Sequence, residues 1–178
     1  MELRFDEDPI LREKCRTLSK KEVLSLEIQE LIDDMGHTAS ERNTGVGISA
    51  NQVGESVAIT VIAIKPTPAR PNLKKFDKVY INTKIVETFG EKELMWEGCL
   101  STARDEYGEP AMGQVPRFGK VRIKYFDREA GEHEEVVEGF VAQVVQHETD
   151  HLNGVLFTDL IDMETLVPYR EYCKMRDQ

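Results

Sequence analysis

The chain has 178 residues, of which 40% are hydrophobic and 31% charged, a balance that argues against a disordered protein and against a membrane protein. Its formal net charge of −10 disfavours nucleic-acid binding, which requires clustered lysine and arginine to neutralise phosphates. The length suits one globular domain, which we expect to cover residues 1–178. The N-terminal residues are acidic and lack a signal-peptide pattern, so a cytoplasmic location is expected.

The first part of the chain predicts two helices, a loop and a strand. Asp8 followed by Pro9 is typical of a helix start and predicts a short helix through Cys15. Ser19 and Glu22 form a capping box for a longer helix, whose expected core positions are Leu24, Ile28, Leu31, Ile32 and Met35. A glycine-containing loop is expected over residues 44–54, and a strand rich in β-branched residues over 57–64.

The rest of the chain predicts strands followed by helices. Prolines 66, 68 and 71 indicate an irregular connection, and residues 78–82 and 84–89 read as strands. Val121, Ile123 and Tyr125 alternate with exposed positions as in a half-buried strand, with a hairpin turn at Gly131 and a return strand over 134–137. Helices are expected over residues 138–153 and 162–174. The pattern favours an α+β fold, with small antiparallel or mixed sheets around a central helix and a C-terminal helix.

The most informative motif is His147-Glu148-Thr149-Asp150-His151, within the first of these helices. Positions i and i+4 share one helical face, so His147 and His151 can hold one metal ion with Glu148 beside it. A polar helix with two surface histidines is the alternative interpretation.

A catalytic metal site needs a third protein ligand, which residue type alone does not identify. His37 and His133 are candidates, although a solvated surface role is favoured for both. Cys99 is another candidate, because Gly98 allows a sharp turn before a thiol that a metal would hold as thiolate. Taken alone, Cys99 is better interpreted as a small buried hydrophobic residue. Cys15, Cys99 and Cys173 are widely spaced and odd in number, which predicts free thiols.

Three segments in order resemble the signatures of the peptide deformylases. They are residues 45–52, ending in Gln52, then Glu97-Gly98-Cys99-Leu100-Ser101, and then residues 146–151. The resemblance implies a metal-dependent hydrolase that removes the formyl group from N-formylmethionine at the start of nascent polypeptides, at the ribosome, without membrane or direct nucleic-acid binding. A metal-bound water is expected to attack the formyl carbon, with Glu148 as general base and acid.

The resemblance also assigns roles to individual residues. The metal ligands correspond to Cys99, His147 and His151, and the ion is expected to be Fe²⁺, replaceable by Ni²⁺, Co²⁺ or Zn²⁺. Gln52 and the backbone N–H of Leu100 are expected to stabilise the oxyanion. The expected substrate contacts are Gly47, Glu97, Gln143 and Val144. For Glu97, a structural role in a pair with Arg117 is favoured over substrate contact, and Gln146 is expected either to support the metal ligands or to lie on the surface.

The sequence departs from the family pattern at three places. Ile48 and Ser49 stand where leucine and alanine are usual, which we expect to leave the loop usable. Residues 102–114 are longer and more polar than usual, and predict a loop near the substrate cleft. Gln143 replaces an aliphatic residue of the methionine pocket, which makes the side-chain preference open. Two alternatives remain at this point: hydrolysis of another N-formyl or N-acyl amine, and a metal-stabilised binding module with a closed four-ligand site.

Overall fold

The structure is a computed structural model, and it describes residues 1–41, 46–66, 72–102, 104 and 108–176. The described residues confirm the α+β class. Their strands join in one antiparallel five-stranded sheet of order β1-β2-β3-β4-β5, so the small sheets expected from the sequence are regions of one continuous sheet. The strands are β1 Gly47–Ser49, β2 Ile59–Ile64, β3 Phe76–Glu97, β4 Gly113–Phe126 and β5 Glu132–Glu138.

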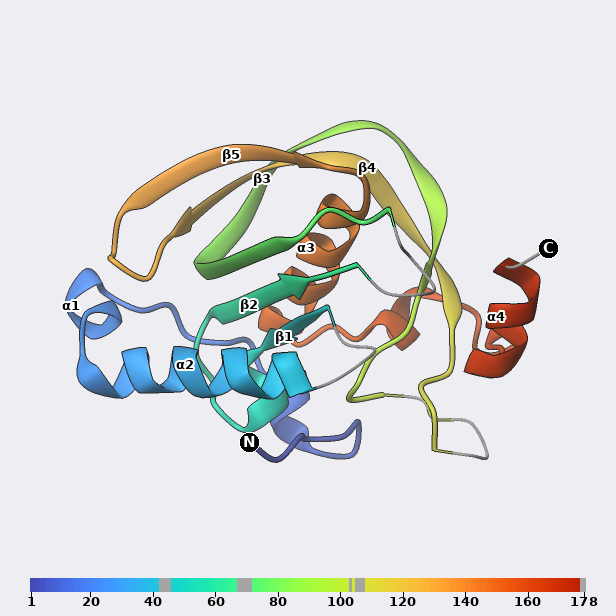
Figure 1. Cartoon of the computed structure of the whole chain (residues 1–178), viewed down its shortest axis with the longest axis horizontal. Coiled ribbons are helices and arrows are strands. Elements are labelled where there is room, and N and C mark those ends of the chain that lie inside the picture. Colours follow the sequence, from blue (N-terminus) through green and yellow to red (C-terminus); the bar gives the residue numbers. More distant parts are fainter. Residues whose placement is uncertain (42–45, 67–71, 103, 105–107, 177–178) are drawn as a thin grey trace.

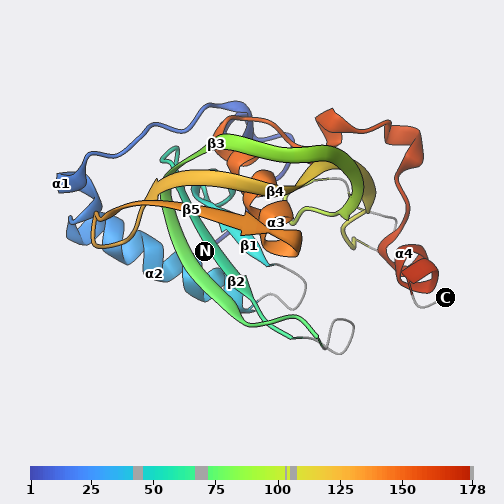
Figure 2. The same cartoon turned by 90° about the horizontal axis from the view of Figure 1, so that it is seen from above.

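Helices cover both faces of this sheet. The helix α3 (Gly139–Leu152) lies inside the curve of β3, β4 and β5, and it contacts all five strands (Figures 1 and 2). On the other side, α2 (Leu26–Glu41) packs across β1 and β2, preceded by the short α1 (Lys20–Val23). The C-terminal α4 (Tyr169–Arg176) lies at the opposite end of the molecule from α1 (Figure 1). Among the described residues, no helix is both long and apolar enough to cross a membrane.

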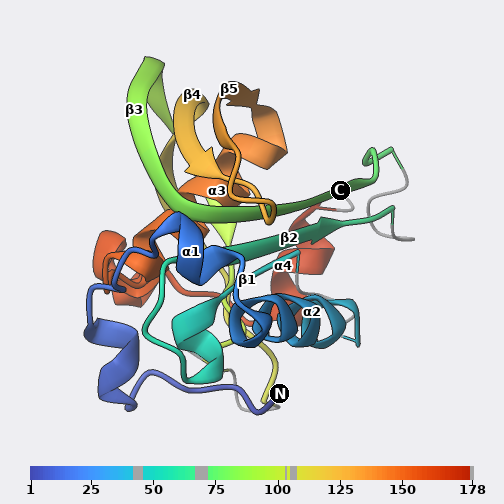
Figure 3. The same cartoon turned by 90° about the vertical axis from the view of Figure 1, so that its left-hand side faces the viewer.

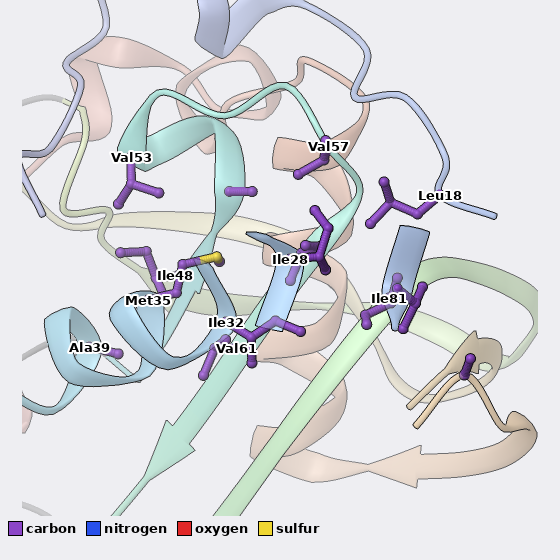
Figure 4. Close-up of a cluster of buried hydrophobic side chains, with 14 of the residues drawn as sticks. Leu18, Ile28, Ile32, Met35, Ala39, Ile48, Val53, Val57, Val61 and Ile81 are labelled. Carbon is purple, nitrogen blue, oxygen red and sulfur yellow. The ribbon is translucent and has the colours of Figure 1, made fainter. Parts of the chain in front are cut away.

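The strand β2 contributes to two hydrophobic cores because its side chains alternate between the faces of the sheet. Ile59 and Val61 belong to the cluster formed with α2, shown in Figure 4. Ile62 and Ile64 belong to a second cluster, formed with α3. A strand covered on both faces is apolar throughout, which explains the continuous apolar run in this part of the sequence.

The strand β3 is 22 residues long and bends the sheet around α3. Its pairing with β4 shifts register between Ile81 and Lys84 and at two later points, and such bulges bend a strand. In Figure 3 its first part lies beside β2, and its second part turns upward beside β4 and β5. Residues 78–82 and 84–89, predicted as two strands, are therefore parts of one. Asn82, with φ of 56°, interrupts the regular backbone but does not end the strand.

Several predicted boundaries were wrong for local reasons. The helix expected from Ser19 is divided into α1 and α2, which leaves Leu24 60% exposed and places Val23 in the core instead. The helix expected through Cys15 is a 3₁₀ helix, Pro9–Arg12, and α4 begins only at Tyr169. The helix expected over 138–153 is confirmed as α3, one residue shorter at each end. Thr44, Gly45, Pro68 and Pro71 lie outside the described residues.

The packing of α2 predicts which of its side chains carry stability. Met35→Ala should lower the free energy of unfolding by about 2–5 kcal/mol, because it leaves a cavity at a side chain that is 0% exposed. Leu26→Ala, on the same helix but 73% exposed, should change it by less than about 0.5 kcal/mol. Urea unfolding of both variants measures the difference, and similar losses in the two would contradict this packing.

Candidate metal centre

Two imidazoles of α3 and one thiol from the segment after β3 meet in the interior. The rings of His147 and His151 lie one helical turn apart, with centroids separated by 5.1 Å. Cys99 Sγ lies 3.2 Å from His151 Nε2. One ligand atom from each of the three residues lies within 4.8 Å of the others. Helical spacing aligns the histidines, and the end of β3 supplies the cysteine.

This donor set fits a divalent metal ion. Bond lengths of about 2.3 Å to sulfur and 2.0–2.1 Å to nitrogen place two ligands of a tetrahedral ion about 3.3–3.6 Å apart, close to the observed sulfur–nitrogen separation. Burial raises the pKa of the Cys99 thiol, but the neighbouring His151 and His147 imidazoles outweigh it and hold that pKa well below its ordinary value. The surroundings therefore favour the thiolate, the form that coordinates metals.

The other two histidines lie elsewhere, as their surface interpretation predicted. His37 is exposed and pairs with Glu41 one turn later on α2. His133 is on β5, where it contacts Asp127 and stacks on the Tyr125 ring. Neither belongs to the metal-ligating cluster of the described residues.

The carboxylate of Glu97 orients one of the metal-site imidazoles. Its Oε2 lies 2.9 Å from His147 Nδ1, so His147 presents its other nitrogen to the centre. Burial alone would raise the pKa of Glu97. Hydrogen bonds from His147 and Arg117 outweigh this effect, and the pKa is lowered to about 2. Both carboxylate oxygens are occupied, since Oε1 accepts from Arg117 and from Gln143 Nε2. A substrate contact by Glu97 stays a prediction, and the geometry supports the predicted pair with Arg117.

Arg117 connects β4 to this carboxylate through a buried ion pair. Its Nε and Nη2 donate to the two oxygens of Glu97 at 2.8 and 3.0 Å, and both side chains are at most 5% exposed. Its Nη1 donates to Asp150 on α3. Asp150, which lies between the two histidines of the motif, therefore pairs with Arg117 and links α3 to β4. Gln146 was predicted to support the metal ligands or to lie on the surface. It is buried, and it pairs instead with the backbone N–H and C=O of Phe118 on β4.

The strand β1 holds Glu148 from one side. Ser49 Oγ donates to Glu148 Oε2 at 2.7 Å and lies 3.1 Å from Thr60 Oγ1, all buried. Gly47 faces the other oxygen: a Cβ there would lie 2.5 Å from Glu148 Oε1. Between them, Ile48 points the opposite way, into the α2 core. Burial raises the pKa of the Glu148 carboxyl, which brings it closer to neutral pH.

Gln52 is fixed beside the thiol by a 3₁₀ helix, Ala50–Val53. Its Oε1 accepts from the Ser49 N–H at 2.9 Å, and its Nε2 donates to Ser101 Oγ at 3.0 Å and lies 3.6 Å from Cys99 Sγ. At 2% exposure, Gln52 is a buried site residue. The capping of a short helix therefore aims its amide N–H₂ at the centre.

These groups open into one cavity of about 150 Å³. All ten residues predicted for the site lie on its walls except His151, which lies behind them at 1% exposure. The described part of the segment 102–114, predicted to lie near the cleft, contributes Pro110 and Met112. The other walls include Val46, Ala63, Leu73, Trp96, Phe140, Tyr169 and Tyr172.

Comparison with known proteins agrees with this geometry. The family model for polypeptide deformylase matches residues 1–166. The chain belongs to the polypeptide deformylase family. The peptide deformylase of Leptospira biflexa is 34% identical over 172 residues, covering 92% of this chain and 89% of that protein. That of Zymomonas mobilis subsp. mobilis is 39% identical over 152 residues, covering 85% and 80%.

Solved structures of deformylases share the fold. A class I type b peptide deformylase from Acinetobacter baumannii, with Met-Ala-Ser bound, matches with a TM-score of 0.82 and 36% identity over 90% of this chain and 98% of that one. The Thermotoga maritima peptide deformylase matches with a TM-score of 0.73 and 31% identity, covering 90% and 97%. The resemblance found in the sequence is confirmed, and the chain is a metalloenzyme of the hydrolase class.

Sequence reasoning missed three supporting features of this deformylase site. Ser49 was expected to be neutral, yet its hydroxyl binds Glu148. Asp150 received no role, yet its carboxylate accepts a hydrogen bond from Arg117. The contribution of α4 to the cavity wall was not predicted, because no local sequence pattern indicates where the C-terminal segment packs.

The buried pair predicts a strong effect at Arg117. Arg117→Met should lower the free energy of unfolding by about 3–5 kcal/mol, because it leaves the Glu97 charge buried and uncompensated. It should also weaken metal binding about 10–100-fold, since Glu97 then holds His147 less firmly. Arg122→Met is the control: it lies on the same strand, but its pairs with Glu87 and Glu134 are exposed, so about 1 kcal/mol or less is expected. Urea unfolding and metal titration measure both effects, and equal small losses would contradict the assigned role.

Proposed function

We propose that this chain removes the formyl group from N-formylmethionine at the start of newly synthesised polypeptides, with a metal held by Cys99, His147 and His151. The observation that carries the proposal is the meeting of this thiol and two imidazoles beside the buried Glu148, in the wall of a cavity. Family membership supports the reaction. The open position of a three-ligand site favours catalysis over a closed structural site.

A bound divalent ion would lower the pKa of a water molecule to about 7 and polarise the formyl oxygen. Glu148 would then act as the general base and general acid of the reaction. The Oε2 of Glu148 accepts a hydrogen bond from Ser49, whereas the Oε1 of Glu148 lies beside Gly47 at the cavity wall. Oε1 is therefore the oxygen placed to take the proton from the attacking water and return it to the departing amine. Such assistance typically contributes about 10²–10⁴-fold to the rate.

Gln52 and Leu100 would stabilise the developing charge. As the formyl carbon becomes tetrahedral, its oxygen gains negative charge and needs hydrogen-bond donors already in place. Gln52 is held by the Ser49 N–H and Ser101, so its amide need not reorganise. The backbone N–H of Leu100, adjacent to the ligand Cys99, is the second proposed donor. Loss of one such donor costs roughly 3–4 kcal/mol of transition-state stabilisation.

The methionine side chain would be bound by α3 and β1. Val144 and Gly47 line the cavity beside the metal centre, and Gln143 lines it one turn before His147. Gln143 Nε2 donates to the Trp96 carbonyl at 2.8 Å, which holds the amide against β3. A polar group fixed in this wall supports a relaxed preference at the first residue, with polar unbranched side chains accepted beside methionine.

The proposal also covers the identity of the metal ion and the location of the protein in the cell. We propose Fe²⁺ as the ion, replaceable by Ni²⁺, Co²⁺ or Zn²⁺, since one thiolate and two imidazoles suit all four. We further propose that residues 1–178 act as one catalytic domain, in the cytoplasm, on chains emerging from the ribosome. The family match over residues 1–166 supports the single domain.

A deformylation assay with metal analysis tests this function. Protein purified without oxygen should contain about one iron per chain and release formate from formyl-Met-Ala-Ser. Glu148→Gln should keep its metal but lose turnover about 10²–10⁴-fold. Cys99→Ser should lose metal and turnover together.

Cys173→Ser is the matched control, because Cys173 lies on α4 outside the metal-ligating cluster of the described residues. It should retain both metal and activity. Formyl-Leu and formyl-Gln peptides, assayed in parallel, report the side-chain preference. An unmodified chain that holds metal but releases no formate from any of these peptides would contradict the proposal.

Ser49 predicts a smaller, separable effect. Ser49→Ala removes the hydrogen bond to Glu148 Oε2 and should lower kcat about 3- to 10-fold, the size of one hydrogen bond of about 0.5–1.5 kcal/mol. KM and metal content should stay unchanged, because Ser49 itself neither lines the cavity nor belongs to the metal-ligating cluster. Steady-state kinetics measure the split, and Ser40→Ala, at an exposed hydroxyl on α2, is the control. A rise in KM together with the fall in kcat would argue against a positioning role.

A further inference from the structure

The C-terminal helix contributes to the active-site cavity. Three residues of α4, Tyr169, Tyr172 and Arg176, line the same cavity as Cys99 and Glu148. This helix lies entirely beyond residue 166, where the family match ends. Tyr172 is only 7% exposed, so its ring is packed into the protein rather than resting on the surface. The family signatures therefore do not describe this wall.

Backbone and aromatic contacts fix α4 in this place. Met112 and Val167 exchange two backbone hydrogen bonds, of 2.8 and 2.9 Å, just before the helix begins. The Tyr172 ring then packs on Trp96, with ring centroids 5.4 Å apart, and Tyr169 lies 6.3 Å from Tyr172. In Figure 1, α4 lies beside the chain segment that leads into β4. The wall is held by contacts at both its start and its middle.

Trp96 connects this wall to the metal centre. It directly precedes Glu97, which orients His147, and its carbonyl accepts the hydrogen bond from Gln143. The α3 residues that line the cavity, Phe140, Gln143 and Val144, precede His147 by one or two turns, and under the proposed function they would face the formylated residue. The aromatic wall comes from separate segments and is available to a longer substrate.

We propose that Tyr172, with Trp96 and Tyr169, forms a binding surface for the residues that follow methionine in the substrate. The inference rests on the proposed deformylase function. Aromatic faces pack well against peptide planes and apolar side chains. Binding energy from a remote part of the substrate raises kcat/KM only for substrates that possess that part.

Two substrates of different length test the surface. Tyr172→Ala should lower kcat/KM for formyl-Met-Ala-Ser about tenfold, but for formyl-methionine amide by less than about twofold. Tyr172→Phe, which keeps the ring, should restore the tripeptide value. Met175→Ala, on the same helix but 53% exposed, is the control and should change neither. Thermal unfolding of each variant accompanies the kinetics, and Tyr169→Ala provides the same comparison if Tyr172→Ala folds poorly.

The outcomes separate the two levels of the proposal. A loss confined to the tripeptide supports the surface. Equal losses on both substrates, or no loss on either, would overturn it while leaving the deformylase function intact. Failure of the unmodified, metal-loaded chain to deformylate either substrate would overturn the function itself, and the surface with it.

Discussion

The buried ion pair between Arg117 and Glu97 is the interaction on which the rest of the site depends. It joins the middle of β4 to the end of β3, and through Glu97 it reaches the imidazole of His147. The third nitrogen of Arg117 holds Asp150 on the same helix as the histidines. One guanidinium thus connects both strands to α3 at the level of the metal centre. Such a pair specifies a position well only when every charge is satisfied, as it is here.

The curvature of the sheet makes this arrangement possible. Cys99 follows β3, and the histidines lie on α3, so the three candidate ligands meet only if β3 turns around the helix. The bulges of β3 produce that turn, and two hydrogen bonds between the Gln146 side chain and the backbone of Phe118 hold α3 against β4. A bound metal would then join segments far apart in sequence, and ligand binding of this kind adds directly to the stability of the folded state.

The sequence predicted those features that depend on local spacing. The pair His147 and His151 was recognisable because a single helical turn aligns them, and α3 itself was placed within one residue at each end. Cys99 required the family resemblance, because its partner His151 is 52 residues away. The full length of β3 was missed since its second half is mostly polar and exposed. Contacts across the fold, such as that of Ser49 with Glu148, cannot be read from either residue's neighbours in the chain.

The short strand β1 belongs to two layers of the molecule at once. Ile48 is part of the hydrophobic core under α2, whereas Gly47 and Ser49 on either side of it touch the two oxygens of Glu148. A shift of Ile48 would move Gly47 and Ser49, the residues bonded to it, and with them the contacts of the Glu148 carboxylate. Repacking beneath α2 would therefore alter the chemistry without replacing any residue of the cavity. Substitutions in the core beneath α2 are therefore limited by the position of the Glu148 carboxylate on the other face of β1.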